Sequence, residues 1–207
     1  MRFFVTILNT SKNRDGELMT IEIKALNPDM GEIFINYVKN IDFSHAPHWQ
    51  FCHCQYYHIK CDSEVWRSRT SEQNEELARQ NIRDGVMQGF LAFDGENPVG
   101  WINANDWRNY ALLEEDEELL GFEGKTALVV CFLIHPDYRR QGLAKKLLKT
   151  AVENFREKGF DRVVGRPFVW EKQPERQYHG VPGMYEALGF EKISEVNGIS
   201  TYVLDLK

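Results

Sequence analysis

The sequence is poor in features that would indicate several classes of protein. With 25 Lys and Arg against 31 Asp and Glu, the formal net charge is −6, so the chain lacks the basic excess typical of nucleic-acid-binding proteins. No apolar run approaches the roughly 20 residues that a transmembrane helix needs. The short apolar stretch at residues 3–8 is not followed by the small-residue cleavage site of a secretory signal. We therefore expect a cytoplasmic protein that binds neither nucleic acid nor membrane.

Cysteine is also scarce, with four in 207 residues. Three of them lie in the segment 43–61, together with four of the six histidines. Cys52, His53 and Cys54, with either His58 or Cys61, offer the nitrogen and sulfur ligands that zinc prefers. The Cys-x-Cys spacing is nevertheless poor for a zinc site, and no second cysteine pair follows. We therefore expect no bound metal and reduced thiols, with a zinc-stabilised interaction module as an alternative.

The composition is that of an ordinary globular domain. At 43% apolar and 27% charged residues, 207 residues can bury one sizeable core. A polar stretch at residues 11–16 precedes Met19, after which a strand-like alternation of apolar residues begins. We expect residues 1–18 to be a leader or a loosely ordered extension, and residues 19–207 to form a single domain. A natural start at Met19 is the alternative.

The most informative stretch runs from Val130 to Phe155. It begins with an apolar run bounded by Pro136, continues through a basic turn, and ends in apolar residues at the spacing of one helix face. The first N–H groups of a helix lack internal partners, and the helix dipole favours an anion there. Gly142 lets the backbone approach a ligand closely, and Arg139 and Arg140 are suited to phosphate. This arrangement predicts a pyrophosphate site.

Two common phosphate-binding patterns are missing from this stretch. Gly142 is not followed by the Lys-Ser/Thr of a Walker loop, and the three spaced glycines of a dinucleotide loop are absent. The stretch does contain Arg139-x-x-Gly142-x-Ala144, and Tyr185-x-x-x-Gly189-Phe190 follows downstream. In this order and context the two motifs resemble those of the GNAT superfamily of N-acetyltransferases, which bind acetyl-coenzyme A (acetyl-CoA). The resemblance covers Met19 to the C-terminus.

The other predicted elements follow the order of that family. Strands are expected at 20–26, 89–93, 99–103, 126–134 and 161–168, with a final hairpin that turns at Asn197-Gly198. Helices are expected from 28, with Ile33, Phe34, Tyr37 and Val38 on one face, from Ser71 with an imperfect capping box to Asn74, at 143–155 and at 181–188. The resemblance implies an α/β (α+β mixed) GNAT fold. Its sheet is mixed and mostly antiparallel, with a central splayed parallel pair and helices on both faces.

The resemblance also implies which residues bind acetyl-CoA. The strand before the turn would pair its exposed backbone with the pantetheine arm, and by position this role falls on Phe132, Leu133 and Ile134. The pyrophosphate would be bound by the turn and the start of the helix, namely by Arg139, Arg140, Gln141, Gly142, Leu143 and Ala144.

The catalytic residues are less clearly indicated. Tyr185 matches the family tyrosine that protonates the departing sulfur, although a core-filling tyrosine is the alternative. Many members place a glutamate base on the strand at 126–134, which carries no carboxylate here. We expect Glu123, just before that strand, to act through water. Asp106, His135 and water alone are alternatives.

The segment between the two early helices walls the acceptor pocket in this family. We therefore expect Trp49, Phe51, Tyr56, Tyr57 and His58 to bind the acceptor, because such rings supply flat apolar contact with a polar edge. The acidic run 114–118 is interpreted as a solvated loop or helix start, with attraction of a cationic amine as the alternative.

Together these patterns predict an acetyl-CoA-dependent N-acetyltransferase. The acetyl group would pass to a primary amine of a small molecule by direct attack in a ternary complex. A non-catalytic coenzyme A sensor of the same fold is an alternative. The sequence specifies neither the amine nor the oligomeric state, for which a homodimer would be the commonest assembly.

Overall fold

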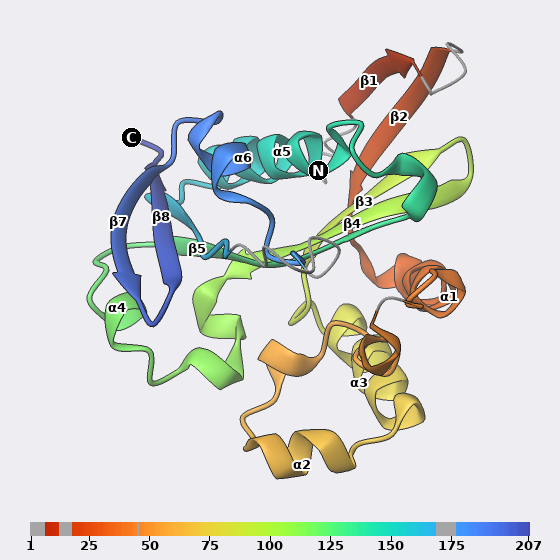
Figure 1. Cartoon of the computed structure of the whole chain (residues 1–207), viewed down its shortest axis with the longest axis horizontal. Helices are drawn as coiled ribbons and strands as arrows, with labels where there is room; N and C mark the ends of the chain where they lie inside the picture. Colours follow the sequence, from red (N-terminus) through yellow and green to blue (C-terminus); the bar gives the residue numbers. More distant parts are fainter. Residues whose placement is uncertain (1–6, 13–17, 45, 169–176) are drawn as a thin grey trace.

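The computed structural model describes residues 7–12, 18–44, 46–168 and 177–207. In these ranges one eight-stranded mixed sheet has helices on both of its faces (Figure 1). The strands are β1 (Ile7–Lys12), β2 (Leu18–Ala25), β3 (Gly89–Asp94), β4 (Asn97–Asp106), β5 (Thr126–Ile134), β6 (Arg162–Gly165), β7 (Glu191–Val196) and β8 (Ile199–Asp205), in the spatial order β1-β2-β3-β4-β5-β6-β8-β7. The α-helices are α1 (Gly31–Asn40), α2 (Ser63–Ser68), α3 (Ser71–Arg83), α4 (Glu117–Leu120), α5 (Leu143–Glu157) and α6 (Pro182–Glu186). Their lengths do not suit a bilayer: no helix in the described part of the chain is long and apolar enough to cross one.

The centre of the sheet positions the candidate site. β5 and β6 are parallel, and they pair only from Thr126 to Val129 and from Arg162 to Gly165. Beyond Val129, β5 continues to Ile134 in register with β4 alone. A bulge at Val130, which lies between the pairs Ala104–Val129 and Asn103–Cys131, bends the strand at this point. The predicted mostly antiparallel sheet with a splayed parallel pair is therefore confirmed.

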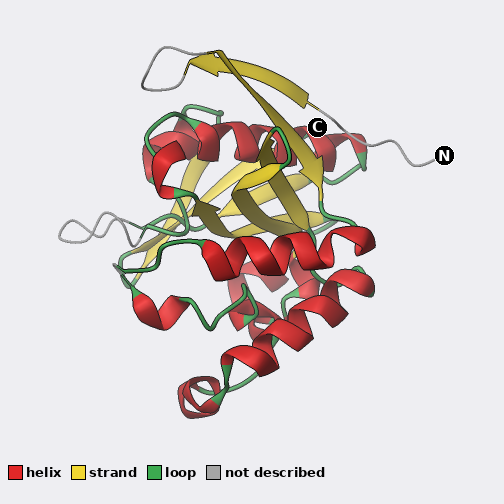
Figure 2. Cartoon of the chain, turned by 90° about the vertical axis from the view of Figure 1, so that its right-hand side faces the viewer, coloured by secondary structure: helices red, strands yellow, loops and turns green. Residues whose placement is uncertain are grey.

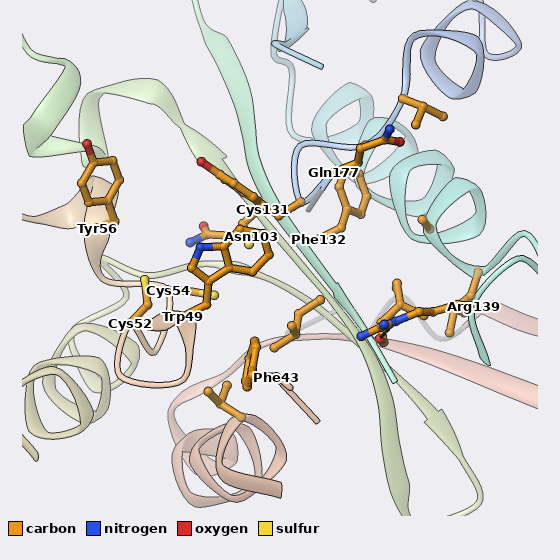
Figure 3. A pocket seen from close by; sticks show the side chains of 18 of the residues that line it. Phe43, Trp49, Cys52, Cys54, Tyr56, Asn103, Cys131, Phe132, Arg139 and Gln177 are labelled. Carbon is orange, nitrogen blue, oxygen red and sulfur yellow. Dashed lines mark hydrogen bonds between the residues drawn. The ribbon is translucent and has the colours of Figure 1, made fainter. Parts of the chain in front are cut away.

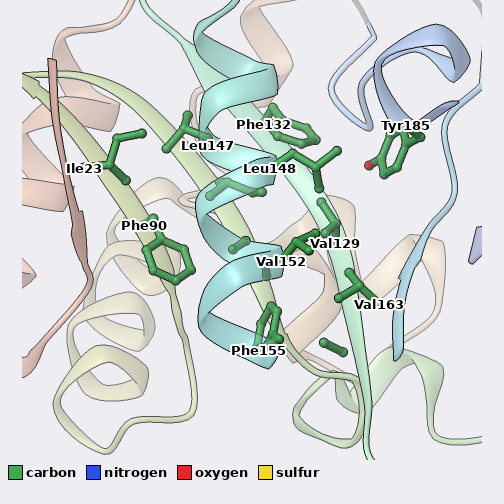
Figure 4. Packing of buried hydrophobic residues seen from close by; sticks show 14 of the residues in the cluster. Ile23, Phe90, Val129, Phe132, Leu147, Leu148, Val152, Phe155, Val163 and Tyr185 are labelled. Atoms are coloured by element: carbon green, nitrogen blue, oxygen red, sulfur yellow. The ribbon is translucent and has the colours of Figure 1, made fainter. Parts of the chain in front are cut away.

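Alternating side chains give the sheet its two cores. Phe90 and Ala92 belong to the core under α5, whereas Leu91 and Phe93 pack with α1 and α3 on the other face. Figure 4 shows the row from α5, with Leu147, Leu148, Val152 and Phe155, against the strands. Each such fully buried side chain stabilises the fold by about 1.5–3 kcal/mol. This packing holds the start of α5 at the splayed end of β5.

The first two long helices differ in detail from the expectation. Ile33 is 39% exposed and Ile35 is buried in its place, because the apolar stripe of α1 is centred on Phe34 and Val38. The capping box of α3 lies one residue earlier than predicted. Thr70 accepts a hydrogen bond from the Gln73 N–H at 3.3 Å, and the Gln73 side chain accepts one from the Thr70 N–H at 2.9 Å.

The N-terminal part of the sheet begins earlier than expected. β1 pairs antiparallel with β2 from Ile7–Ile23 to Lys12–Leu18, and this pair forms one rim of the sheet (Figure 2, top). Ser11 and Lys12, expected in a polar leader, therefore belong to a strand. The division of the chain at residue 18 stays a prediction.

Candidate active site

A cavity of about 770 Å³ opens where β5 separates from β6 (Figure 3). Four parts of the chain supply most of its lining: the segment 43–57 after α1, the middle and end of β5, the turn and start of α5, and residues 177–184. Single residues of α1, α2 and β4 add to it, namely Val38, Trp66 and Asn103. Figure 3 shows Arg139 at one end and Trp49, Cys52 and Tyr56 at the other. The two ends have different chemistry.

The end at α5 is suited to an anion. Gly142 is the N-cap of α5 with a φ of +78° and without a side-chain cap. The first N–H bonded inside the helix is that of Lys146, to the Gly142 carbonyl, so the three N–H groups before it are available to a ligand. A Cβ added at Gly142 would meet nothing within 4 Å. Arg139, Arg140 and Lys145 add positive charge to this end of the cavity.

The residues predicted to bind acetyl-CoA lie together here. All of them line the cavity except Gln141, whose side chain donates a hydrogen bond to the Asp137 carbonyl. Two backbone groups at the splayed end of β5 already have hydrogen-bond partners. The Phe132 N–H donates to the Tyr178 carbonyl at 2.6 Å, and the Leu133 carbonyl accepts from the Tyr37 hydroxyl at 2.8 Å. Alternation along the strand directs the Ile134 N–H to the same side as that of Phe132.

The opposite end is built from aromatic rings, which we call the aromatic wall. Its members are Trp49, Phe51, Tyr56, Tyr57, Trp66 and Tyr178. Ring centroids lie 5.1 Å apart for Tyr56–Trp66 and Trp49–Tyr178, and 5.2 Å apart for Phe51–Trp66 and Tyr56–Tyr57. The wall is also tied to α3, because buried Asn74 donates to the Phe51 carbonyl at 2.8 Å. Four of the five predicted acceptor contacts are therefore in the wall.

His58 is the predicted acceptor residue that does not line the cavity. Its Nδ1 lies 3.2 Å from the Asn109 carbonyl, and its Nε2 lies 3.4 Å from Nδ2 of Asn103. Asn103 does line the cavity and also accepts from the Tyr110 hydroxyl at 2.9 Å. Burial lowers the pKa of His58 to about 4. The imidazole is therefore neutral, and its Nε2 can accept a hydrogen bond from the Asn103 carboxamide.

Tyr185 lies beside the cavity and not in its lining. Its side chain is fully buried between Phe190 and Tyr202, and its hydroxyl donates to the His179 carbonyl at 2.9 Å. Gly165 makes room for the ring, since a Cβ there would lie 2.1 Å from it. Burial raises the pKa of this phenol. In this arrangement the hydroxyl is committed to a backbone carbonyl.

The predicted base Glu123 lies far along β5 from the cavity. It borders a separate depression with Gly124, Asp161 and Arg162, next to the beginning of β5. Asp106, the carboxylate alternative, pairs with Ala127 near that same end. The cavity opens at the other end of the strand, so neither carboxylate reaches it. No Asp or Glu occurs among the cavity-lining residues that the structure describes.

Three thiols line the cavity, those of Cys52, Cys54 and Cys131. All four cysteines are free. Burial raises the pKa of Cys52 to about 12, and a hydrogen bond with Cys131 together with burial raises the pKa of Cys54. The thiols of Cys52 and Cys54 are therefore protonated and weakly nucleophilic. In the described ranges no group of three or more His, Cys, Asp or Glu side chains is arranged to bind a metal ion.

Several residues of the site were not predicted from the sequence. His179 is 7% exposed, and its Nε2 lies 3.0 Å from the hydroxyl of Tyr57. Burial lowers the pKa of His179 to about 3. Asn103 and Cys131 were also missed. A buried Asn within the otherwise apolar 99–103 strand was the one available signal, because a polar side chain at such a position needs a partner.

The acidic run 114–118 is largely paired away from the cavity. Asp116 and Glu118 bind the guanidinium of Arg166, which is 2.8 Å from Asp116 and 2.9 Å from Glu118. Glu114 and Glu115 contact Lys60. The run is thus a helix start and a set of ion pairs, and it does not supply a charge to the cavity.

Comparisons with known proteins agree with this geometry. The family model described as the acetyltransferase (GNAT) family matches residues 52–190, which is more than half of the chain. The thialysine N-epsilon-acetyltransferase of Caenorhabditis elegans is 26% identical over 152 residues, covering 72% of this chain and 81% of that protein. Among solved structures, the GNAT domain of S. lividans PAT superposes with a TM-score of 0.57 at 15% identity, covering 96% of each chain. The PaiA N-acetyltransferase of Thermoplasma acidophilum, in complex with coenzyme A, superposes with a TM-score of 0.52 at 17% identity, covering 90% of this chain and 99% of that one. With its splayed strand, uncapped helix start and matching family model, the chain belongs to the GNAT family of acetyltransferases.

Proposed function

We propose that this protein transfers the acetyl group of acetyl-CoA to a primary amine of a small molecule, by direct attack in a ternary complex. The observation that carries the proposal is the single cavity with a cationic, donor-rich end at α5 and an aromatic end free of described carboxylates. Such a cavity can bind a phosphate-bearing donor and a small acceptor at the same time.

The α5 end fits the pyrophosphate of acetyl-CoA. It combines free helix N–H groups, open space at Gly142 and positive charge from Arg139, Arg140 and Lys145. The relative from Thermoplasma acidophilum was solved in complex with coenzyme A, which supports the same class of ligand here. When bound, acetyl-CoA would supply an activated acetyl group as a thioester. On β5 the Ile134 N–H would bond to its pantetheine arm directly, and the Phe132 N–H would do so once released from the Tyr178 carbonyl.

The cavity favours direct attack over an acetylated cysteine. The lining thiols of Cys52 and Cys54 have raised pKa values, so little thiolate is available to attack. With no described carboxylate in the lining, we assign the removal of the amine proton to water. The acceptor would then enter as the free base, and turnover would rise with pH as the free amine becomes more abundant.

Two tyrosines are candidates for the general acid that protonates the departing sulfur. Tyr185 was expected in this role, but its hydroxyl donates to the His179 carbonyl inside the core. Tyr57 lines the cavity, and its hydroxyl contacts the imidazole of His179. A neutral imidazole N–H directed at the phenol oxygen would stabilise the phenolate that remains after proton transfer. We therefore assign the acid to Tyr57, with His179 as a positioning residue.

Release of free coenzyme A in the presence of a panel of primary amines tests this function. We expect turnover with at least one amine, and an increase in melting temperature on addition of acetyl-CoA, because the ligand binds only the folded state. Binding without turnover on any amine would instead indicate the non-catalytic sensor. Absence of binding would reject the assignment of the α5 end.

A further inference from the structure

The acceptor end of the cavity carries information about the amine itself. We infer that the acceptor is a primary monoamine with an aromatic or similarly flat apolar body, and that short diamines and guanidino-amines are poor acceptors. This inference rests on the proposed function and narrows its substrate class. It follows from the charges, the rings and the neutral polar groups of the lining.

The first step concerns charge. The cationic side chains of the lining, Arg139, Arg140 and Lys145, lie at the α5 end, and no carboxylate occurs among the described lining residues. A diamine would bring a second ammonium group into this space. Without a counter-charge, burial of an ammonium ion is strongly unfavourable, and a contact with an aromatic face offsets only part of that cost.

The second step asks whether a nearby carboxylate could turn toward the cavity. Five acidic side chains on segments near the aromatic wall have cationic partners. Glu114 and Glu115 contact Lys60, Arg166 holds Asp116 and Glu118, and Glu75 on α3 binds Arg79 and Lys39. Recruiting any of these five carboxylates would leave a cation unpaired, so they add no negative charge to the described lining of the cavity.

The third step concerns shape. The aromatic wall presents ring faces and edges in a continuous series from Phe51 through Trp66 and Tyr56 to Tyr57. Trp49 and Tyr178 continue it toward β5. A flat apolar body placed here exchanges water contacts for ring contacts, which is the main source of affinity in small-molecule pockets. An extended polyamine chain would leave most of these surfaces uncovered.

The fourth step places the amino group. Three neutral polar groups line the cavity: the thiol of Cys131 on β5, the carboxamide of its pairing partner Asn103 on β4, and the hydroxyl of Tyr57 in the aromatic wall. Burial raises the pKa of Tyr57 and thereby keeps the phenol protonated. Such groups can hydrogen-bond a free amine without requiring it to be charged. One amino group near β5 and one apolar body at the aromatic wall would match the polar groups and rings described at the acceptor end.

Matched pairs of amines test the inference on the wild-type protein. The rate of coenzyme A release is measured for phenethylamine against 1,4-diaminobutane, and for 4-phenylbutylamine against agmatine, at saturating acetyl-CoA. We expect kcat/KM for each aryl amine to exceed that of its charged counterpart by at least about tenfold. If the diamine or agmatine is the better acceptor, the inference fails while the proposed function stands. If no amine is acetylated although acetyl-CoA raises the melting temperature, the proposed function and this inference both fail.

A variant that introduces a negative charge sharpens the test. Trp66→Glu places a carboxylate in the aromatic wall and should move the preference toward the charged amines by at least about tenfold. Val65→Glu, on the same helix at a residue that is 49% exposed and outside the lining, adds the same charge and should leave the preference unchanged. An equal shift in both variants would show that net charge alone sets the preference and would overturn the inference. Should Trp66→Glu not fold, Tyr56→Glu at the partly exposed mouth of the cavity provides the same comparison.

Discussion

The buried imidazole of His179 is expected to make the fold sensitive to mild acid. The side chain is 7% exposed, and burial lowers its pKa to about 3, compared with roughly 6.5 in an unfolded chain. Above pH 6.5 the imidazole is neutral in both states and has no pH-dependent effect. Between the two pKa values the imidazole is protonated in the unfolded state and neutral in the folded state. Stability is therefore fully present above the unfolded pKa and is lost as the pH falls.

The size of the effect follows from the width of this window. At pH 5.0 the unfolded pKa is about 1.5 units above the pH, and each unit is about 1.36 kcal/mol, so His179 should remove about 2 kcal/mol of unfolding free energy relative to neutral pH. His179→Gln removes the titration and keeps a polar side chain able to reach the Tyr57 hydroxyl, 3.0 Å from the imidazole. The difference between the two proteins isolates this one group.

Urea unfolding at pH 7.0 and pH 5.0, followed by tryptophan fluorescence, measures the effect. The wild type should lose about 2 kcal/mol more than His179→Gln between these pH values. His48→Gln, which removes an exposed imidazole, serves as the matched control and should lose as much as the wild type. Parallel losses in wild type and His179→Gln would refute the reasoning and show that His179 is accessible to protons in the folded state.

Three further experiments test the site. Gly142→Glu places a carboxylate at the uncapped start of α5 and should abolish the acetyl-CoA-induced rise in melting temperature. The control Gly159→Glu, also at a positive φ with open space, should retain that rise. Binding of acetyl-CoA by both variants would reject the loop assignment. Tyr57→Phe should reduce turnover by about 10- to 10⁴-fold with little change in acetyl-CoA affinity. Tyr185→Phe should lower the free energy of unfolding by about 1 kcal/mol and leave turnover largely intact. The reverse result would return the acid role to Tyr185. Trp49→Ala should raise the acceptor KM and leave the Kd of acetyl-CoA, measured by titration calorimetry, within about threefold, or ~0.7 kcal/mol; an equal loss of cofactor affinity would place Trp49 in the cofactor site.

The parts of the site that are local in sequence could be predicted from it. The strand, turn and helix around Gly142 lie within one continuous stretch, so periodicity and one glycine were enough to indicate the anion-binding end. Glu123 shows a different limit. It precedes β5, whereas the cavity opens where β5 ends, and strand direction alone could have excluded it.

The remaining site residues come together only in the folded chain. Asn103, Cys131 and His179 lie on three different segments, and no pattern in the sequence connects them. Tyr185 matches the family motif, but its ring is fully buried in the core. It fits there because Gly165 on β6 has no side chain, and this arrangement depends on a residue outside the motif. The sequence interpretation placed the box at Ser71, although Thr70-x-x-Gln73 satisfies the capping-box rule and Ser71-x-x-Asn74 does not.

The hydrogen bond from the Phe132 N–H to the Tyr178 carbonyl has a kinetic consequence. A ligand that needs this amide must first displace Tyr178, whose ring packs on Trp49 in the aromatic wall. Arrival of the donor at β5 would therefore rearrange the surface that meets the acceptor. Steady-state kinetics should then follow a compulsory order, with the donor adding first and a dead-end acceptor analogue inhibiting uncompetitively against acetyl-CoA.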